Sequence, residues 1–369
     1  MTTVKCTDYK NCQDPQKLAV RSRLTNDSGI VLVLVLWLVA FLSALAFIMG
    51  RSAQADVALA RYQSARIRTE GYVWSGLNFA LARLKNEFSN DTADTDGNHQ
   101  ARIASSTTIL EEAVGTGSFR LSCPVSTEAD EAPATTWFQD EAARLNLNGL
   151  TANNCAVLKE LLLGLGIEAS MAKEISLSVV DWQDADNIPA SGEQDGEDDF
   201  YMSQKRPYHS KNRPLESVEE LLLVKGMTPG ILDTLRPFIT IFPRSGGLRV
   251  NLKTAAKPVL LALARAISAT QINTNLSDAD ALVGKIMEYR NVSQDGTSAT
   301  STEMDAESLK LNAGEKAIFF TLMTYKSMAP EAVRFAVSAK DSYTGVQASG
   351  EFIVDLHTRA ILSWQVSSS

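Results

Sequence analysis

The chain has 369 residues and a net charge of −8, from 43 acidic and 35 basic side chains. An acidic balance of this kind repels phosphates, so nucleic acid is not expected as the main partner. The length suffices for two or three domains, and the hydrophobic fraction of 45% is ordinary for a globular protein.

The first predicted element is an uncharged, apolar segment of 21 residues from Ile30 to Gly50. As a helix it spans about 30 Å, the thickness of the hydrocarbon core of a bilayer. It is too long for the apolar part of a cleaved secretory signal, and no small-residue cleavage site follows it. The sequence therefore predicts a transmembrane helix. The basic residues before it orient the leader towards the inside: Lys5, Lys10, Lys17, Arg21 and Arg23.

The helical pattern continues beyond the apolar segment, and no proline interrupts residues 30–90. We expect one helix of roughly sixty residues whose outer half packs on a globular body. The alternative is a plain membrane anchor followed by a separate amphipathic helix. The predicted buried stripe has spacings of three and four: Val57, Ala60, Ser64, Ile67, Gly71, Trp74, Asn78 and Leu81, widened by Leu77, Leu84 and Phe88.

The rest of the chain alternates between strand and helix patterns. Residues 89–118 are predicted as loops around a short helix, and residues 119–125 and 136–140 as short strands. Leucine-rich helical segments follow over about 140–330, with blocks at 217–235 and 249–290. Alternating apolar residues between Arg334 and Gln365 predict a terminal hairpin.

The N-terminal pattern is a short polar segment ending in Ser28-Gly29, then Ile30 and an unbroken apolar helix. It resembles the leader of type IV prepilins and pseudopilins. The resemblance implies that a prepilin peptidase cleaves after Gly29 and methylates Ile30. Most members of that family carry glutamate at mature position five, where this chain has Leu34. A buried terminal ammonium needs a carboxylate partner in lipid, so a subunit without this glutamate fits best at the tip of a filament.

Further phrases make the resemblance more specific. In chain order they are residues 140–148, 181–186, 197–201, 212–229 and 250–255. Together with the leader they resemble the K-type minor pseudopilins of type II secretion. This resemblance implies an α+β fold, in which a long transmembrane and spine helix packs on a pseudopilin core that is interrupted by two SAM-like helical units. It also implies a bacterial inner-membrane protein with a periplasmic body, and I- and J-type minor pseudopilins and the pseudopilus as partners.

The expected organisation has six parts. They are a leader at 1–29, a transmembrane helix at 30–50, a spine helix and first part of the core at 51–139, a first SAM-like domain with an acidic loop at 140–248, a second SAM-like domain at 249–330, and C-terminal core strands at 331–369.

Eight acidic residues and no lysine or arginine lie between Asp181 and Asp199. Carboxylates gathered in one ordered loop repel each other unless a cation lies among them, and hard oxygen ligands favour calcium. The spacing is not that of an EF-hand, and the family resemblance also implies calcium here. The expected ligands are Asp184, Asp186, Glu197 and Asp198, with Glu193 and Asp199 as reserves. The alternative is a solvated acidic loop. The nearby His209 is expected to hold this loop or to meet a partner.

Catalytic chemistry has little support. The three histidines lie in no nucleophile arrangement, and no Gly-x-Ser-x-Gly or Walker sequence occurs. The leading hypothesis is a minor pseudopilin that caps the pseudopilus. The alternatives are a minor pilin of a related pilus, or a DNA-binding or uptake protein that uses residues 218–232, which resemble a helix–hairpin–helix. Acidic residues around that turn oppose phosphate binding. Cys123 and Cys155 are expected either to form a disulfide or to be separate buried thiols.

Overall fold

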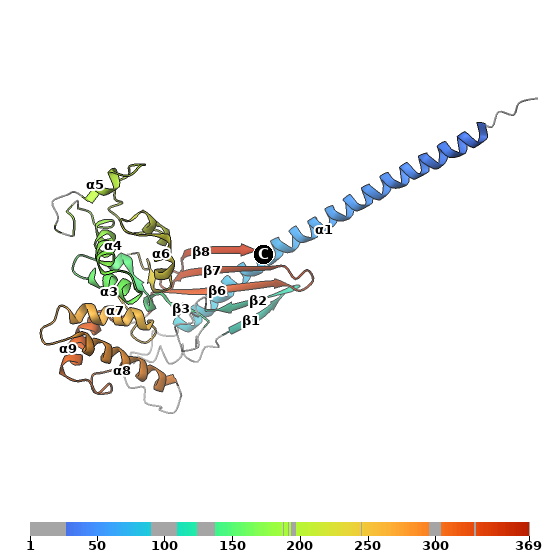
Figure 1. The fold of residues 1–369 in the computed structure, drawn as a ribbon. Helices are drawn as coiled ribbons and strands as arrows, with labels where there is room; N and C mark the ends of the chain where they lie inside the picture. Colours follow the sequence, from blue (N-terminus) through green and yellow to red (C-terminus); the bar gives the residue numbers. More distant parts are fainter. Residues whose placement is uncertain are drawn as a thin grey trace, which may run out of the picture. The chain divides into compact units, whose positions relative to one another are not determined.

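The computed structural model describes residues 27–89, 109–123, 137–186, 188–190, 192, 197–244, 246–294, 304–327 and 330–368. By its internal contacts the chain divides into two units, residues 1–61 and 62–369. The fold is mixed helix and sheet with a long apolar N-terminal helix (Figure 1), which confirms the predicted α+β class. The SAM-like character of the helical units stays a prediction.

Helix α1 (Asp27–Ser89) is continuous over 63 residues, so the prediction of a single long helix is confirmed. In the first unit its apolar side chains are exposed, as expected for a helix whose natural solvent is lipid. In the second unit the helix buries one face against the sheet. The buried residues are Ala65, Thr69, Val73, Leu77, Ala80 and Leu84.

The main stripe predicted for α1 was wrong, and of the predicted set only the widening residues Leu77 and Leu84 are buried. Ile67 is 70% exposed and Trp74 is 38% exposed, whereas Ala65 and Val73 are fully buried. Close approach explains the difference, because small residues let the sheet come near the helix backbone. At Gly76, a Cβ atom would lie 2.5 Å from Val337 Cγ1, so only glycine fits there. The packing therefore selects small side chains on α1 in place of large apolar ones.

The main sheet is antiparallel and follows the strand order β1-β2-β6-β7-β8. Short β3 pairs with the start of β6. The strands are β1 (Ile109–Val114), β2 (Gly117–Ser122), β3 (Gln139–Asp140), β6 (Ala332–Asp341), β7 (Gln347–Asp355) and β8 (Ile361–Ser368). Residues 109–114 form a strand and not a loop, so that prediction was wrong. The predicted C-terminal hairpin is confirmed as β6 and β7, and β8 adds a third strand that was not predicted.

Between β3 and β6 the chain forms a helical insertion. Figure 1 shows its helices beyond the end of the sheet where β3 pairs with the start of β6. Its α-helices are α3 (Ala156–Gly164), α4 (Ala169–Asp181), α5 (Glu197–Met202), α6 (Pro229–Leu235), α7 (Lys257–Ser268), α8 (Leu276–Gln294) and α9 (Ala313–Thr324). Its 3-10 turns are η2 (Glu141–Ala143), η3 (Leu147–Gly149), η4 (Val218–Leu223) and η5 (Arg236–Phe238), and β4 (Leu145–Asn146) pairs in parallel with β5 (Ile239–Thr240).

Two hydrophobic cores hold the second unit together. One lies between α1 and the sheet and contains Trp137, Phe335 and Phe352, whose rings contact one another. The other is continuous through the whole insertion, where α3 packs against α7. It also takes in Ala332 and Ile353 of the sheet. The third helical block begins later than predicted. Val250 and Leu252 are buried outside any helix, and α7 starts at Lys257, where Pro258 suits the first turn.

Candidate functional site

The predicted anchoring residues lie at the start of α1. Among the described residues, α1 is the helix long and apolar enough to cross a membrane, and its apolar window is 0% buried. Ile30 is 68% exposed and Leu34 is 63% exposed. The predicted cleavage after Gly29 and methylation of Ile30 stay predictions, because residues 1–26 lie outside the described part of the chain.

The acidic loop begins where α4 ends. α4 buries Ile175 and Val179 in the insertion core, and this packing fixes the position of Asp181 at its last turn. Asp181 Oδ1 accepts a hydrogen bond from Ala190 N at 2.8 Å. Asp186 Oδ1 accepts one from Ile188 N, also at 2.8 Å. These two bonds bend the loop back towards the helix end.

Asp184 is the electrostatically strained member of this loop. Its Oδ1 atom is inaccessible to solvent and accepts no hydrogen bond from the described residues. Burial raises the pKa of Asp184 to about 6, and repulsion from Asp186 and Asp181 adds to the rise. Burial also raises the pKa of Asp181, with repulsion from Asp186. A carboxylate oxygen without a donor beside two more carboxylates is the arrangement that a bound cation would relieve.

Asp198 on α5 has a different environment. Its Oδ1 accepts hydrogen bonds from Ser210 N at 2.7 Å and Ser210 Oγ at 2.9 Å. Its Oδ2 lies 2.7 Å from His209 Nδ1. The backbone bond from Ser210 and the contact with His209 lower the pKa of Asp198. The prediction that His209 holds the acidic loop is confirmed by this contact.

The structure brings only some of the six predicted ligands together. Asp184 and Asp186 interact together with Asp181, which the predicted set did not include although it ends the preceding helix. Asp198 is engaged by His209 and Ser210, and Asp199 is exposed. Glu193 and the side chain of Glu197 lie outside the described residues. Within the described part of the chain, no three His, Cys, Asp or Glu side chains converge closely enough to hold a metal ion.

A second polar cluster lies where the insertion meets the sheet, and the sequence did not point to it. Glu141 is buried and accepts a hydrogen bond from Arg334 Nε at 2.6 Å and one from the Thr240 hydroxyl. Arg334 Nη1 also donates to Glu351 Oε1 at 2.6 Å. Burial alone would raise the pKa of Glu141, but the charge and hydrogen bonds of Arg334 outweigh it and lower the pKa.

Asp140 and Arg144 complete this junction cluster. Asp140 accepts hydrogen bonds from Asn251 Nδ2 at 2.7 Å and Ala142 N at 2.9 Å. Burial nevertheless raises the pKa of Asp140 to about 6. Burial and the neighbouring Arg334 lower the pKa of Arg144 to about 10. The cluster ties β3 and β6 to the insertion through charged side chains that are largely paired.

In the turn that resembles a helix–hairpin–helix, the positive side chains Lys225 and Arg236 are paired with glutamates. Lys225 Nζ lies 3.1 Å from Glu174 Oε1. Arg236 Nη1 lies 2.7 Å from Glu219 Oε1. Gly226 adopts φ +80°, as the tight turn requires. Cations already paired with carboxylates give little attraction for a phosphate backbone.

The two cysteines are separate. In the described part of the chain Cys123 and Cys155 are thiols and are not bonded to each other. Cys155 Sγ donates a weak hydrogen bond to Ala152 O at 3.4 Å. Of the two alternatives that the sequence left open, the structure has separate thiols.

Comparison with known proteins places these features in a family. The family model described as "Type II secretion system (T2SS), protein K" matches residues 143–244. These residues contain α3–α6 and the acidic loop. The putative type II secretion system protein K of Escherichia coli K12 is 27% identical over 269 residues, covering 69% of this chain and 73% of the relative. The chain is therefore similar to type II secretion system protein K over about two thirds of its length. A second member, from Pectobacterium carotovorum, is 33% identical over 98 residues, or 27% of this chain and 29% of that protein.

A solved structure agrees in fold with this chain. It is a chain from the crystal structure of the GspK–GspI–GspJ complex of the enterotoxigenic Escherichia coli type 2 secretion system. The TM-score is 0.58 at 18% identity, and the match covers 84% of this chain and 99% of the other. The match supports the mixed helix and sheet fold.

Proposed function

We propose that this chain is a minor pseudopilin of a type II secretion system and caps the tip of the pseudopilus. α1 anchors it in the inner membrane by a single span, and the body, residues 62–369, lies in the periplasm. Its role is structural and not enzymatic. The neighbouring solved complex joins a K-type protein to I- and J-type proteins, and we assign the same kind of partners to this chain.

The observation that carries the proposal is the helix that contains Leu34. α1 enters the membrane as an uninterrupted helix, and no carboxylate occurs between residues 30 and 50. In a helical filament, a carboxylate at position five neutralises the terminal ammonium of the adjacent subunit, because an unpaired charge in lipid is expensive. A subunit with leucine there cannot neutralise a subunit placed above it. Only a position with no subunit above avoids this penalty.

The insertion supports the same position. It holds seven of the described α-helices, and it joins the sheet where β3 meets the start of β6. A body enlarged in this way would block the addition of another subunit beyond it. The buried junction cluster, with Arg334 between Glu141 and Glu351, holds the insertion to the sheet. A rigid attachment suits a cap better than a hinged one.

We also propose that calcium stabilises the acidic loop. The donor set fits a hard cation, since Asp184 has a carboxylate oxygen that no described residue donates to, and it lies beside Asp186 and Asp181. Asp184 and Asp186 would hold the ion, together with carboxylates of the predicted set around Glu197. The ion would neutralise repulsion within the loop. His209 and Ser210 would keep Asp198 and α5 in place beside it.

The DNA-binding alternative is disfavoured by charge. Lys225 and Arg236, the cations flanking the turn, are each paired with a glutamate. A gel-shift assay at low salt is expected to show no retarded DNA.

Two measurements test the capping function. Peptide mass spectrometry of the membrane-extracted protein should find a methylated Ile30 as its first residue; a retained leader contradicts the proposal. In a strain that lacks the chromosomal gene, the Leu34→Glu variant should disturb assembly at the tip and reduce secretion, whereas a Leu38→Ile control should not. Unchanged secretion by the Leu34→Glu variant would argue against a tip position.

A further inference from the structure

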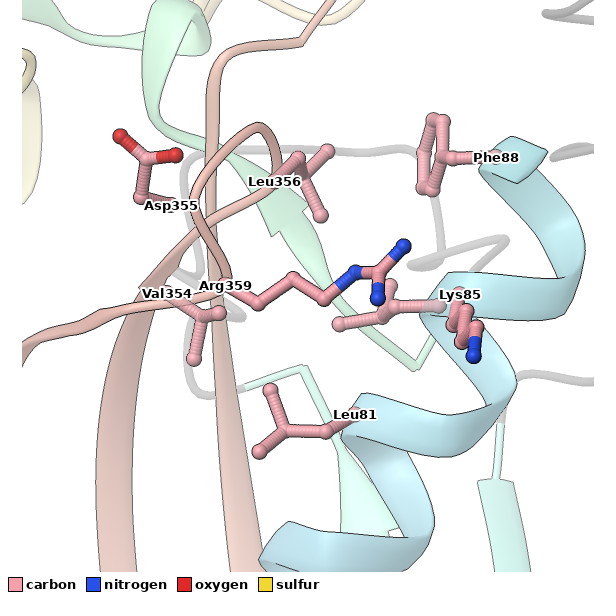
Figure 2. Close-up of a pocket in the computed structure, with 8 residues that line it drawn as sticks. Leu81, Lys85, Phe88, Val354, Asp355, Leu356 and Arg359 are labelled. Atoms are coloured by element: carbon pink, nitrogen blue, oxygen red, sulfur yellow. The ribbon is translucent and has the colours of Figure 1, made fainter.

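A small pocket lies between the end of α1 and the turn that joins β7 to β8. Its volume is about 60 Å³. Apolar side chains line it, from α1 and from the end of β7: Leu81, Leu84, Phe88, Val354 and Leu356. Figure 2 shows Leu81 and Phe88 of the helix facing Val354 of β7 and Leu356 just after it. The pocket is far smaller than a typical cofactor site and suits the end of one apolar side chain.

Two cations stand at the rim of this pocket. In Figure 2 the Arg359 side chain reaches across the opening towards α1, where Lys85 lies, and Asp355 points away from it. Neither Lys85 nor Arg359 forms an ion pair within the described chain. Both side chains are exposed, whereas other cations such as Lys211 and Arg334 are paired with glutamates.

The carboxylate nearest along the chain is committed to the turn. Asp355 Oδ1 accepts hydrogen bonds from His357 N at 2.8 Å and Thr358 N at 2.6 Å. Arg359 N donates to Asp355 O at 2.8 Å, and Asp355 N donates to Ala360 O at 2.9 Å. These hydrogen bonds fix the backbone of the tight turn from Asp355 to Ala360. The turn presents Arg359 in a fixed place, and no carboxylate of the described residues pairs with its guanidinium.

The backbone at Arg359 is strained. Its φ is +61°, in the left-handed region that glycine or asparagine occupies at lower free energy. An arginine there costs about 1 kcal/mol relative to those residues. Strain of this kind, at a side chain that reaches over a pocket, points to a use for the side chain itself.

We propose that this pocket binds a segment of another polypeptide that carries an apolar side chain next to a carboxylate. The apolar side chain enters between Phe88 and Leu356, and the carboxylate accepts hydrogen bonds from Arg359 and Lys85. Arginine is the donor best suited to a planar carboxylate. The simpler role for the two cations is to offset the partial negative charge at the carboxyl end of α1. The two roles predict different effects of substitution at Arg359.

The test is a titration of the full-length protein in detergent with a fluorescent peptide, acetyl-Gly-Leu-Glu-Phe-Glu-Gly-amide, followed by anisotropy. We expect this peptide to bind about tenfold more tightly than its analogue with glutamine in place of glutamate, because charge-assisted hydrogen bonds are about twice as strong as neutral ones. The Arg359→Asn variant should lose about tenfold in affinity and Lys85→Gln several-fold. The matched control is Lys173→Gln, an exposed lysine on α4.

Thermal unfolding of the same variants separates the two roles. Arg359→Asn removes the strain at φ +61°, so its thermal midpoint should equal or exceed that of the parent protein while peptide affinity falls. A lowered midpoint would assign Arg359 to structure and overturn the proposal. Equal affinity for the acidic and amide peptides, no binding of either, or unchanged affinity in Arg359→Asn would also overturn it.

Discussion

The junction cluster and the acidic loop are both rich in charged residues, but their charges are balanced differently. At the junction, Glu141 and Glu351 meet Arg334, with Arg144 nearby. In the loop, eight carboxylates occur without a lysine or arginine between residues 181 and 199. Most charges of the junction are paired within the protein, whereas the carboxylates of the loop have no lysine or arginine beside them in the sequence.

The pKa values reflect this contrast. Arg334 lowers the pKa of Glu141 in spite of its burial, so the junction keeps its charges at neutral pH. The pKa of Asp184 rises to about 6, because burial and its acidic neighbours act in the same direction. A balanced cluster joins two parts of a fold, whereas an unbalanced one is suited to a ligand.

The largest effect is expected from breaking the balanced cluster at Arg334. Replacing it by methionine in Arg334→Met leaves Glu141 buried without its partner and should lower the free energy of unfolding by about 3–5 kcal/mol. Urea unfolding of the full chain in detergent, followed by the fluorescence of tryptophans such as the buried Trp137, measures the loss.

The control is Arg120→Met, which removes an exposed pair with Glu111 and should cost about 1 kcal/mol or less. The double variant Glu141→Gln/Arg334→Met should recover part of the loss, since no charge is then buried alone. If Arg334→Met were no worse than Arg120→Met, the junction would not depend on charge balance.

The second prediction concerns the one junction carboxylate that is not balanced. Burial raises the pKa of Asp140 from 3.8 to about 6, so the folded state binds its proton more tightly than the unfolded state does. Stability should therefore fall as the pH rises from about 4 to about 6, by about 3 kcal/mol for a shift of about two units, and stay flat above that.

The Asp140→Asn variant should lack this fall, and the difference between its curve and the parent curve isolates the contribution of Asp140. Asp305→Asn is the matched control, because that carboxylate is exposed and its pKa is lowered, so its contribution has the opposite sign. Parallel curves for the parent and Asp140→Asn would contradict the assignment.

The third prediction is that calcium balances the loop. At a calcium concentration one hundred times its dissociation constant, binding should raise the free energy of unfolding by about 2.7 kcal/mol. In Asp184→Asn the stabilisation by calcium should disappear, and the protein without calcium should be no less stable than the parent. Calorimetric titration measures binding directly. The absence of heat at millimolar calcium would contradict a calcium site.

Much of the fold followed from local pattern. β6 and β7 alternate apolar and polar residues, and α1 has no proline, so their type could be predicted from the sequence. β1 could not, because Glu111 and Glu112 interrupt its apolar residues. Its pairing depends on β2, where Arg120 contacts Glu111. Partners distant in sequence decide such a strand.

Some features of the candidate site could likewise be predicted from the sequence and others could not. The excess of acid in residues 181–199 was visible by counting, and the contact of His209 with the loop followed from its basic neighbourhood. The junction was not visible, because Glu141 and Arg334 are 193 residues apart. Nor was the pocket, whose cations Lys85 and Arg359 come from opposite ends of the body. Single exposed charges in a sequence do not reveal which lack a partner.

The smallest effect is expected from His209, which joins Asp198 to the segment after α5. Its side chain is exposed, so His209→Gln should change the free energy of unfolding by less than about 1 kcal/mol. Local opening should respond more strongly, with faster amide exchange at residues 198–212, because among the described residues the Ser210 bonds alone then hold Asp198. His357→Gln, another exposed histidine, should leave exchange unchanged. Calcium should reduce the effect of His209→Gln if the ion orders the same loop. An equal effect with and without calcium would separate the His209 contact from the metal site, and would leave the loop with two independent restraints.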